Sequence, residues 1–129
     1  MWSGQASPFG FTAGDTPGRP WLPQPEWFAN HTTERAIADT DSFWHLYREA
    51  LHLRRSLPQL GEGPLRWLDS PPDVLAFVRG DGLVCAVNFG DRKAPAPVTG
   101  TPLLTSRPCP LGILPGNTAA WWICEHCTA

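Results

Sequence analysis

The residues with the most distinctive chemistry lie at the end of the sequence, where Cys124-Glu125-His126-Cys127 forms a Cys-x-x-Cys motif. Two such thiols can bind zinc or cycle between a dithiol and a disulfide. A structural zinc site needs four ligands, however, and Cys85 and Cys109 show no second paired spacing. A redox motif of this kind opens a helix after a strand, which is not its setting here. We therefore expect residues 124–129 to be a frayed tail without a metal or redox role.

A second candidate metal site is formed by His45, Glu49 and His52, which are spaced to lie on one side of a helix. Three such ligands could hold a divalent cation. The same residues also make an ordinary solvated helix face, and no second helix offers complementary ligands. One Glu-x-x-His pair is not a di-iron motif, which needs two pairs and further carboxylates. The sequence therefore predicts no metal site and no cofactor.

The 12 Asp and Glu residues lie in expected loops, turns and the polar side of a helix. Retaining glycoside hydrolases need a carboxylic acid and a carboxylate about 5 to 5.5 Å apart on rigid elements. The sequence also has no glycine-rich phosphate loop and no G-x-S-x-G motif. We therefore expect no catalytic residue in this chain, and substrate-binding residues stay unknown at this stage.

Size and charge exclude several classes of protein. The chain has 129 residues, which is room for one domain at most, and a net charge of -2. Ten Lys and Arg residues against 12 Asp and Glu residues leave no basic stripe for nucleic acid. No run approaches the roughly 18 consecutive apolar residues of a membrane helix. We expect a cytoplasmic protein that binds neither nucleic acid nor membranes.

The first 39 residues predict a long loop, because closely spaced Pro and Gly residues interrupt any helical or strand periodicity. A solvated linker would not need its six large aromatic residues, so we expect them to pack on a surface supplied by other parts of the protein. Contact with a sugar ring is a secondary interpretation. These residues are Trp2, Phe9, Phe11, Trp21, Trp27 and Phe28.

An amphipathic helix is predicted from Asp41 to Leu57, with Thr40 or Asp41 as its cap and Pro58 as its stop. Its apolar residues cover an arc of about 180°, which calls for one broad neighbour. Arg54 falls inside this arc, where it needs a partner or must extend into solvent. The apolar residues are Phe43, Leu46, Tyr47, Ala50, Leu51, Leu53 and Leu57.

Short strands are predicted for the rest of the chain. Asp73 to Arg79 and Leu83 to Phe89 are predicted to form a hairpin. Each strand contains a continuous apolar run, so the side chains on both of its faces are apolar and both faces should be at least partly covered. The stretch from Lys93 to Pro97 is expected to be a proline-broken connection. The pattern predicts a small antiparallel β-sandwich. The remaining strands are Leu65 to Leu68, Leu103 to Ser106 and Ala119 to Cys124.

A family resemblance rests on segments spread over residues 2–123, read in order. Trp2-Ser3-Gly4, Pro8-Phe9-Gly10-Phe11, Pro20-Trp21-Leu22-Pro23, Asp41-Ser42, Tyr47-Arg48 and Leu53-Arg54-Arg55 resemble the end of the catalytic barrel of α-glucosidases in the α-amylase superfamily. That group is glycoside hydrolase family 13, and the resemblance is to its oligo-1,6-glucosidase and maltase type. Val74 to Arg79, Val87-Asn88-Phe89 and Leu114-Pro115 through Trp121 resemble the β-sandwich that follows the barrel.

The resemblance implies an α+β chain in three parts. Residues 1–58 would be a barrel remnant with the substrate-side loop and the last helix, residues 59–123 the sandwich, and residues 124–129 the tail. In this family the catalytic carboxylates stand on barrel strands before the Trp2 loop, and those strands are absent from this sequence. The aromatic loop and the broad apolar arc then share one explanation, because both would normally lie against the barrel.

Two functions follow from this reasoning. The first is a C-terminal fragment of a retaining α-glucosidase-like glycoside hydrolase that lacks the catalytic carboxylates and is inactive alone. It would meet an oligosaccharide only in the context of a complete barrel, which a separate chain could supply. The alternative is a stand-alone carbohydrate-binding or interaction module that stacks sugars or docks a separate barrel chain. Whether the chain is itself an enzyme is left open at this stage.

Overall fold

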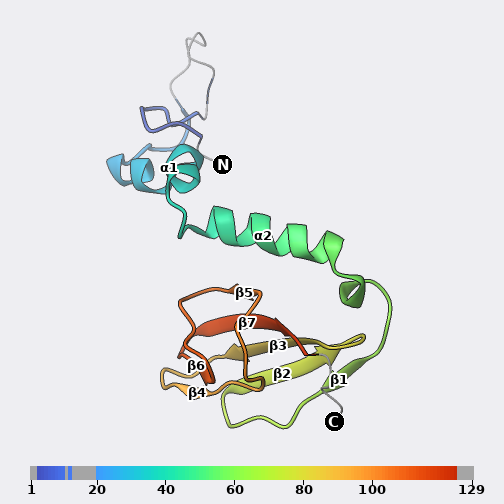
Figure 1. The fold of residues 1–129 in the computed structure, drawn as a ribbon. Helices are drawn as coiled ribbons and strands as arrows, with labels where there is room; N and C mark the ends of the chain where they lie inside the picture. Colours follow the sequence, from blue (N-terminus) through green and yellow to red (C-terminus); the bar gives the residue numbers. More distant parts are fainter. Residues whose placement is uncertain (1–2, 11, 13–19, 125–129) are drawn as a thin grey trace. The chain divides into compact units, whose positions relative to one another are not determined.

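A computed structural model of the chain describes residues 3–10, 12 and 20–124 (Figure 1). The chain divides into two compact units, Met1–Arg48 and Glu49–Ala129, which are described separately. None of the helices in the described ranges is both long enough and apolar enough to cross a membrane.

The N-terminal unit contains two short helices that the sequence did not predict. The 3-10 helix η1 spans Glu26–His31, and helix α1 spans Thr33–Ala38. The buried Thr32 caps α1, because its side-chain oxygen accepts a hydrogen bond from the backbone N–H of Arg35 at 3.3 Å. The expectation of a loop through residue 39 was therefore wrong for residues 26–38, where this cap and the helix-favouring residues after it decide the local structure.

Helix α2 spans Phe43–Ser56, as predicted within two residues at either end. Ser42 precedes its first turn, and the Ser42 carbonyl accepts from the N–H of Leu46 at 3.2 Å. The expected cap at Thr40 or Asp41 was wrong, because the chain is still turning there, with the N–H of Asp41 bonded to the Asp39 side chain. Arg54 extends into solvent rather than taking a buried partner.

The C-terminal unit is built on a five-stranded antiparallel sheet in the order β1-β2-β3-β7-β5 (Figure 1). The strands are β1 (Leu65–Trp67), β2 (Val74–Arg79), β3 (Leu83–Asn88), β7 (Thr118–Ile123) and β5 (Leu104–Thr105). The 3-10 helix η2 (Pro58–Leu60) leads into β1. All five strands lie within predicted segments to within one residue.

A second, two-stranded sheet pairs β4 (Ala94–Pro95) with β6 (Ile113–Leu114). The α+β class with a small antiparallel sandwich is therefore confirmed. The stretch from Lys93 to Pro97 was expected to be only a connection. That expectation was wrong, because Ala94 pairs with Leu114 and forms β4. Two-residue strands carry too little periodicity to be seen in a sequence.

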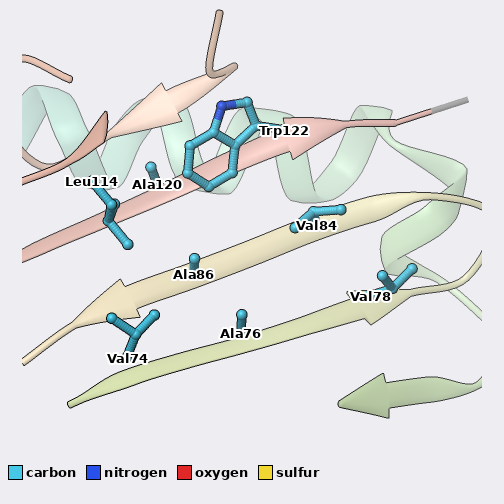
Figure 2. Close-up of a cluster of buried hydrophobic side chains, with 8 residues drawn as sticks. All are labelled: Val74, Ala76, Val78, Val84, Ala86, Leu114, Ala120 and Trp122. Carbon is cyan, nitrogen blue, oxygen red and sulfur yellow. The ribbon is translucent and has the colours of Figure 1, made fainter. Parts of the chain in front are cut away.

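The inner face of the five-stranded sheet carries the core (Figure 2). Trp122 from β7 is 2% exposed, and Leu114 from β6 is buried with it. Burying side chains of this size supplies about 1.5–3 kcal/mol each, so this cluster is the main source of stability in the unit. The cluster consists of Val74, Ala76, Val78, Val84, Ala86, Leu114, Ala120 and Trp122.

The opposite side of the same sheet is called the outer face here. It is defined by the strand residues that alternate with the inner ones: Leu65, Trp67, Leu75, Phe77, Arg79, Leu83, Cys85, Val87, Leu104, Ala119, Trp121 and Ile123. Strand β3 is covered on both faces, as predicted, whereas β2 alternates between buried inner positions and partly open outer ones. The prediction that both faces are at least partly covered is thus confirmed, with nearly complete coverage for β3 and partial coverage of the outer face for β2.

Candidate functional site

The cysteines do not come together among the described residues. Cys85 lies in the middle of β3, Cys109 lies in the segment before β6, and both have free thiols. Cys124 takes part in a disulfide, and its N–H donates to the Gly82 carbonyl at 2.9 Å. The other residues of the Cys-x-x-Cys motif, Glu125, His126 and Cys127, lie outside the described residues.

The histidine and glutamate side chains of α2 are used or solvated. A ring nitrogen of His45 hydrogen bonds to the carbonyl of Ile37 at 2.9 Å, while Glu49 and His52 are exposed. Within residues 3–10, 12 and 20–124, no three His, Cys, Asp or Glu side chains are grouped so that they could hold a metal ion.

The carboxylates are the groups that glycoside hydrolysis would require. An acid catalyst in such an enzyme is a carboxyl group kept protonated by an apolar setting, opposite a second carboxylate. Each Asp and Glu in the described part of the chain is exposed. No carboxylate in that part therefore has the environment of a catalytic acid.

The aromatic residues of the N-terminal unit fall into two groups. Phe9 is buried against Phe28, with ring centroids 6.1 Å apart, and Phe28 also meets Trp27 edge-on at 4.5 Å. Trp21, by contrast, is 98% exposed, and Trp27 is exposed as well. Trp2 and Phe11 lie outside the described residues. Phe9 and Phe28 thus contact each other within residues 1–39, whereas the expectation was a surface supplied by other parts of the protein, and Trp21 leaves its apolar ring exposed.

The outer face of the sheet carries an apolar row that crosses all five strands. Trp67, Phe77, Cys85, Trp121 and Leu104 are consecutive cross-strand partners. Cross-strand partners lie on the same face and contact one another. The row is closed in the middle, where Cys85 is buried, and open at the β1 edge, where Trp67 is 64% exposed.

Two further apolar residues, Leu65 and Leu75, are exposed on the same face. Apolar side chains therefore remain exposed to solvent on this face, whereas the other face of the sheet carries the packed core. Sequence reasoning missed this surface because alternation identifies the two faces of a strand but not which of them has a neighbour.

A pocket of about 470 Å³ lies at the loops beside the sheet. It is lined by Pro71, Pro72, Asp73, Asn88, Gly90, Asp91, Arg92, Lys93, Ala94 and Pro95. Asn88 is buried and organises these loops, because its side chain donates to the carbonyls of Arg92, Leu114 and Pro115 and accepts from the N–H of Gly90. The polar atoms of Asn88 are therefore committed to the protein itself and are not offered to a ligand.

Comparison with known proteins shows that the chain resembles parts of carbohydrate-active enzymes. No family model matches the sequence. An α-glucosidase from Pediococcus pentosaceus is 31% identical over 94 residues, which are 69% of this chain and 16% of that enzyme. The chain thus spans about a sixth of the length of this curated relative.

Solved structures share the fold over nearly the whole chain. The trehalose-6-phosphate hydrolase of Bacillus licheniformis matches 94% of the chain with a TM-score of 0.72 and 19% identity. An α-glucosyl transfer enzyme matches 94% with a TM-score of 0.68 and 24% identity. The α-amylase from H. orenii matches 78% with a TM-score of 0.61 and 21% identity.

In each of these structures the match covers 24% of the solved chain. The expected order of an amphipathic helix followed by a small antiparallel sandwich is the fold found in that shared part. The sequence match to the α-glucosidase agrees with it and with the order of the segments from Val74 to Trp121. The chain is thus similar in sequence to a part of an α-glucosidase and shares its fold with a part of other carbohydrate-active enzymes, of which it spans between about a sixth and a quarter of the length.

Proposed function

We propose that this chain acts as the C-terminal scaffold of a retaining α-glucosidase-like glycoside hydrolase and does not cleave glycosidic bonds by itself. Its contribution would be to brace a (β/α)₈ barrel and to support the substrate entrance. The partner is therefore an apolar surface of a barrel, and oligosaccharide would be bound only when that barrel is present.

One observation carries this proposal: the sheet has a finished inner core, yet its outer face leaves Trp67, Leu65 and Leu75 in contact with water. An isolated domain gains nothing from such exposure, and exposed apolar surfaces promote association. In an assembled enzyme the same residues would be buried and would contribute to stability.

The absence of activity follows from the chemistry of the reaction. Cleavage with retention needs an acid that protonates the leaving group and a nucleophile held about 5 to 5.5 Å away. The exposed carboxylates of the described residues provide neither the burial nor the pairing. We therefore infer that the described residues serve positioning rather than bond cleavage.

An activity assay tests the first half of the proposal. The purified chain is incubated with maltose, isomaltose and an aryl α-glucoside, and we expect no turnover above buffer. Turnover that a single Asp→Asn or Glu→Gln substitution in this chain abolishes would overturn the claim of inactivity. Turnover that survives every such substitution would indicate a contaminating enzyme, which a second purification tag removes.

The apolar surface is tested with a hydrophobic dye and light scattering. We expect the chain to bind an anilinonaphthalene dye and to self-associate, and Trp67→Lys to reduce both signals. Leu111→Lys is the matched control, because Leu111 is 70% exposed but lies in a loop outside the outer face. An equal effect of both substitutions, or no dye binding by the unmodified chain, would contradict the docking role of the outer face.

A second candidate function is supported by Trp21, whose ring is almost completely exposed on the N-terminal unit. An exposed indole can stack on a sugar ring, so the chain would then be a stand-alone carbohydrate-binding module. Maltotriose titration with tryptophan fluorescence distinguishes the two functions. A saturable change that Trp21→Ala removes in a monomeric, cooperatively melting chain would favour the module over the scaffold.

A further inference from the structure

The connection from α2 to the sheet is stiff. Backbone hydrogen bonds continue past the last turn of α2, from the N–H of Leu57 to the Leu53 carbonyl at 2.9 Å and from Leu60 to Leu57 at 3.1 Å. The N–H of Gly61 then bonds to Pro58 at 2.9 Å. Backbone hydrogen bonds therefore continue from the end of α2 to residue 61, and this stretch contains no flexible hinge.

This segment is held by the turn that joins β2 to β3. The Arg79 guanidinium donates from Nη2 to the Gly61 carbonyl at 2.9 Å, and the N–H of Gly80 donates to the Pro64 carbonyl at 3.0 Å. A hydrogen bond from a charged donor is among the stronger ones. The two bonds bracket residues 61–64, so this connection is fastened at both of its ends.

Close packing adds a steric requirement at Gly80. Its φ of +53° lies in the left-handed region, and a Cβ there would come within 2.9 Å of the Gln59 carbonyl oxygen. The obstacle is backbone and cannot rotate away. A Cβ at Gly63, in the connection before β1, would likewise come within 3.0 Å of the Gly80 Cα. Glycine is therefore needed for η2 and the turn to touch.

Burial on the outer face differs between β3 and the β1 edge of the sheet. Leu83, the cross-strand partner of Arg79, is only 1% exposed. Trp67 and Leu75, farther from this turn along the strands, are exposed. Leu65, the cross-strand partner of Arg79 on β1, is exposed as well, so the outer face beside the β2–β3 turn is closed at β3 and open at the β1 edge.

We infer that Arg79 and Gly80 form a joint with Gln59 and Gly61 that makes the C-terminal half of α2 and the sheet one cooperative folding unit. The joint lies entirely within residues 49–129 and does not depend on the proposed docking of a barrel. In a scaffold it would keep the sheet in one orientation relative to the last helix, so that the outer face always meets its partner the same way.

Hydrogen exchange of the full chain, followed by mass spectrometry, tests the joint. Arg79→Met removes the bond to Gly61, and Arg66→Met on the neighbouring strand is the matched control. We expect amides of residues 53–61 to exchange about tenfold faster in Arg79→Met, as the loss of one charge-assisted bond implies. Exchange in β3 and β7 should not change. Equal protection of residues 53–61 in both variants would overturn the joint, and so would uniform loss across the sheet.

A second pair of variants is tested by limited trypsin digestion at low protein concentration. Arg54 and Arg55 are exposed tryptic sites in the last turns of α2, and their cleavage requires local opening of the helix. Gly80→Ala should speed cleavage there severalfold, whereas Gly100→Ala, where a Cβ meets nothing within 4 Å, should not. Unchanged cleavage in Gly80→Ala would contradict the joint even if the proposed scaffold role were correct.

Discussion

Trp67 and Phe77 face each other across β1 and β2, with ring centroids 5.8 Å apart and planes at 84°. Edge-to-face pairs of this kind contribute about 0.5–1.5 kcal/mol beyond the area that they bury. Trp67 nevertheless leaves most of its surface in water. Contact with Phe77 thus fixes the position of the Trp67 ring on the outer face, although the ring is mostly exposed in the isolated chain. This arrangement is expected of a docking residue.

The two faces of the sheet should respond differently to the loss of a tryptophan. Trp122→Ala removes a buried core ring and should lower the free energy of unfolding by about 3–5 kcal/mol. Trp67→Ala loses an edge-to-face contact and partial burial, and should cost only about 1–2 kcal/mol. Urea unfolding followed by far-ultraviolet circular dichroism gives both values. A larger loss for Trp67→Ala than for Trp122→Ala would show that the core lies on the outer face.

Asn88 is the buried polar residue on which the loops beside the pocket depend. Asn88→Ala would leave the Leu114 carbonyl and its neighbours without their donor, and should cost about 2–4 kcal/mol in free energy of unfolding. Asn117→Gly is the control, because it removes one exposed bond to Asp91 and keeps a residue that tolerates the positive φ of that position. We expect the control to lose less than about 1 kcal/mol in the same urea experiment. Similar losses for the two variants would contradict the organising role of Asn88.

The parts of the fold that were predicted from sequence are those with long, regular patterns. The apolar arc from Phe43 to Leu57 and the continuous apolar runs of β2 and β3 each extend over several residues, so periodicity identified them. Helix α1 was not predicted because the closely spaced prolines before Glu26 interrupt any periodicity, and its six residues are too few to show one of their own. Thr32 followed by the acidic Glu34 was a usable capping signal.

The candidate site was less predictable for a physical reason. Trp67 and Phe77 are ten residues apart, and their contact depends on the register of β1 against β2, which a sequence does not state. Asn88 gave no signal either, because an asparagine at the end of a strand looks like an ordinary turn residue. The apolar arc and the aromatic loop predicted a large neighbour, which stays a prediction, and the exposed outer face is a separate apolar surface that the sequence did not reveal.

The two free thiols should differ in reactivity. Cys85 is buried in β3 beside Trp121, whereas Cys109 is half-buried and donates from Sγ to the Ile113 carbonyl at 2.9 Å. Alkylation with iodoacetamide at pH 8, followed by peptide mass spectrometry, should label Cys109 first. Cys85 should be labelled only as fast as the sheet opens. Faster labelling of Cys85 would mean that the middle of the outer-face row is open to solvent.

The Cys85 thiol should also make stability depend on pH. Burial raises the pKa of Cys85 above its usual value of about 8.5, and the hydrogen bond from the Trp121 side chain offsets only part of this effect. The folded state therefore favours the neutral thiol, and this contribution to stability is fully present below the unfolded-state pKa and is lost as the pH rises through the folded-state pKa.

The free energy of unfolding should accordingly fall more steeply with pH above about 8.5 in the unmodified chain than in Cys85→Ala. Urea midpoints of the two proteins from pH 7 to pH 10 provide the measurement, and only the difference between them is used, so that lost packing at position 85 cancels. The variant Cys109→Ala is measured in the same way, because burial raises the pKa of the Cys109 thiol as well. A difference that stays constant up to pH 10 would show that the Cys85 thiol ionises equally easily in the folded and unfolded chain, and that the centre of the outer face is not desolvated.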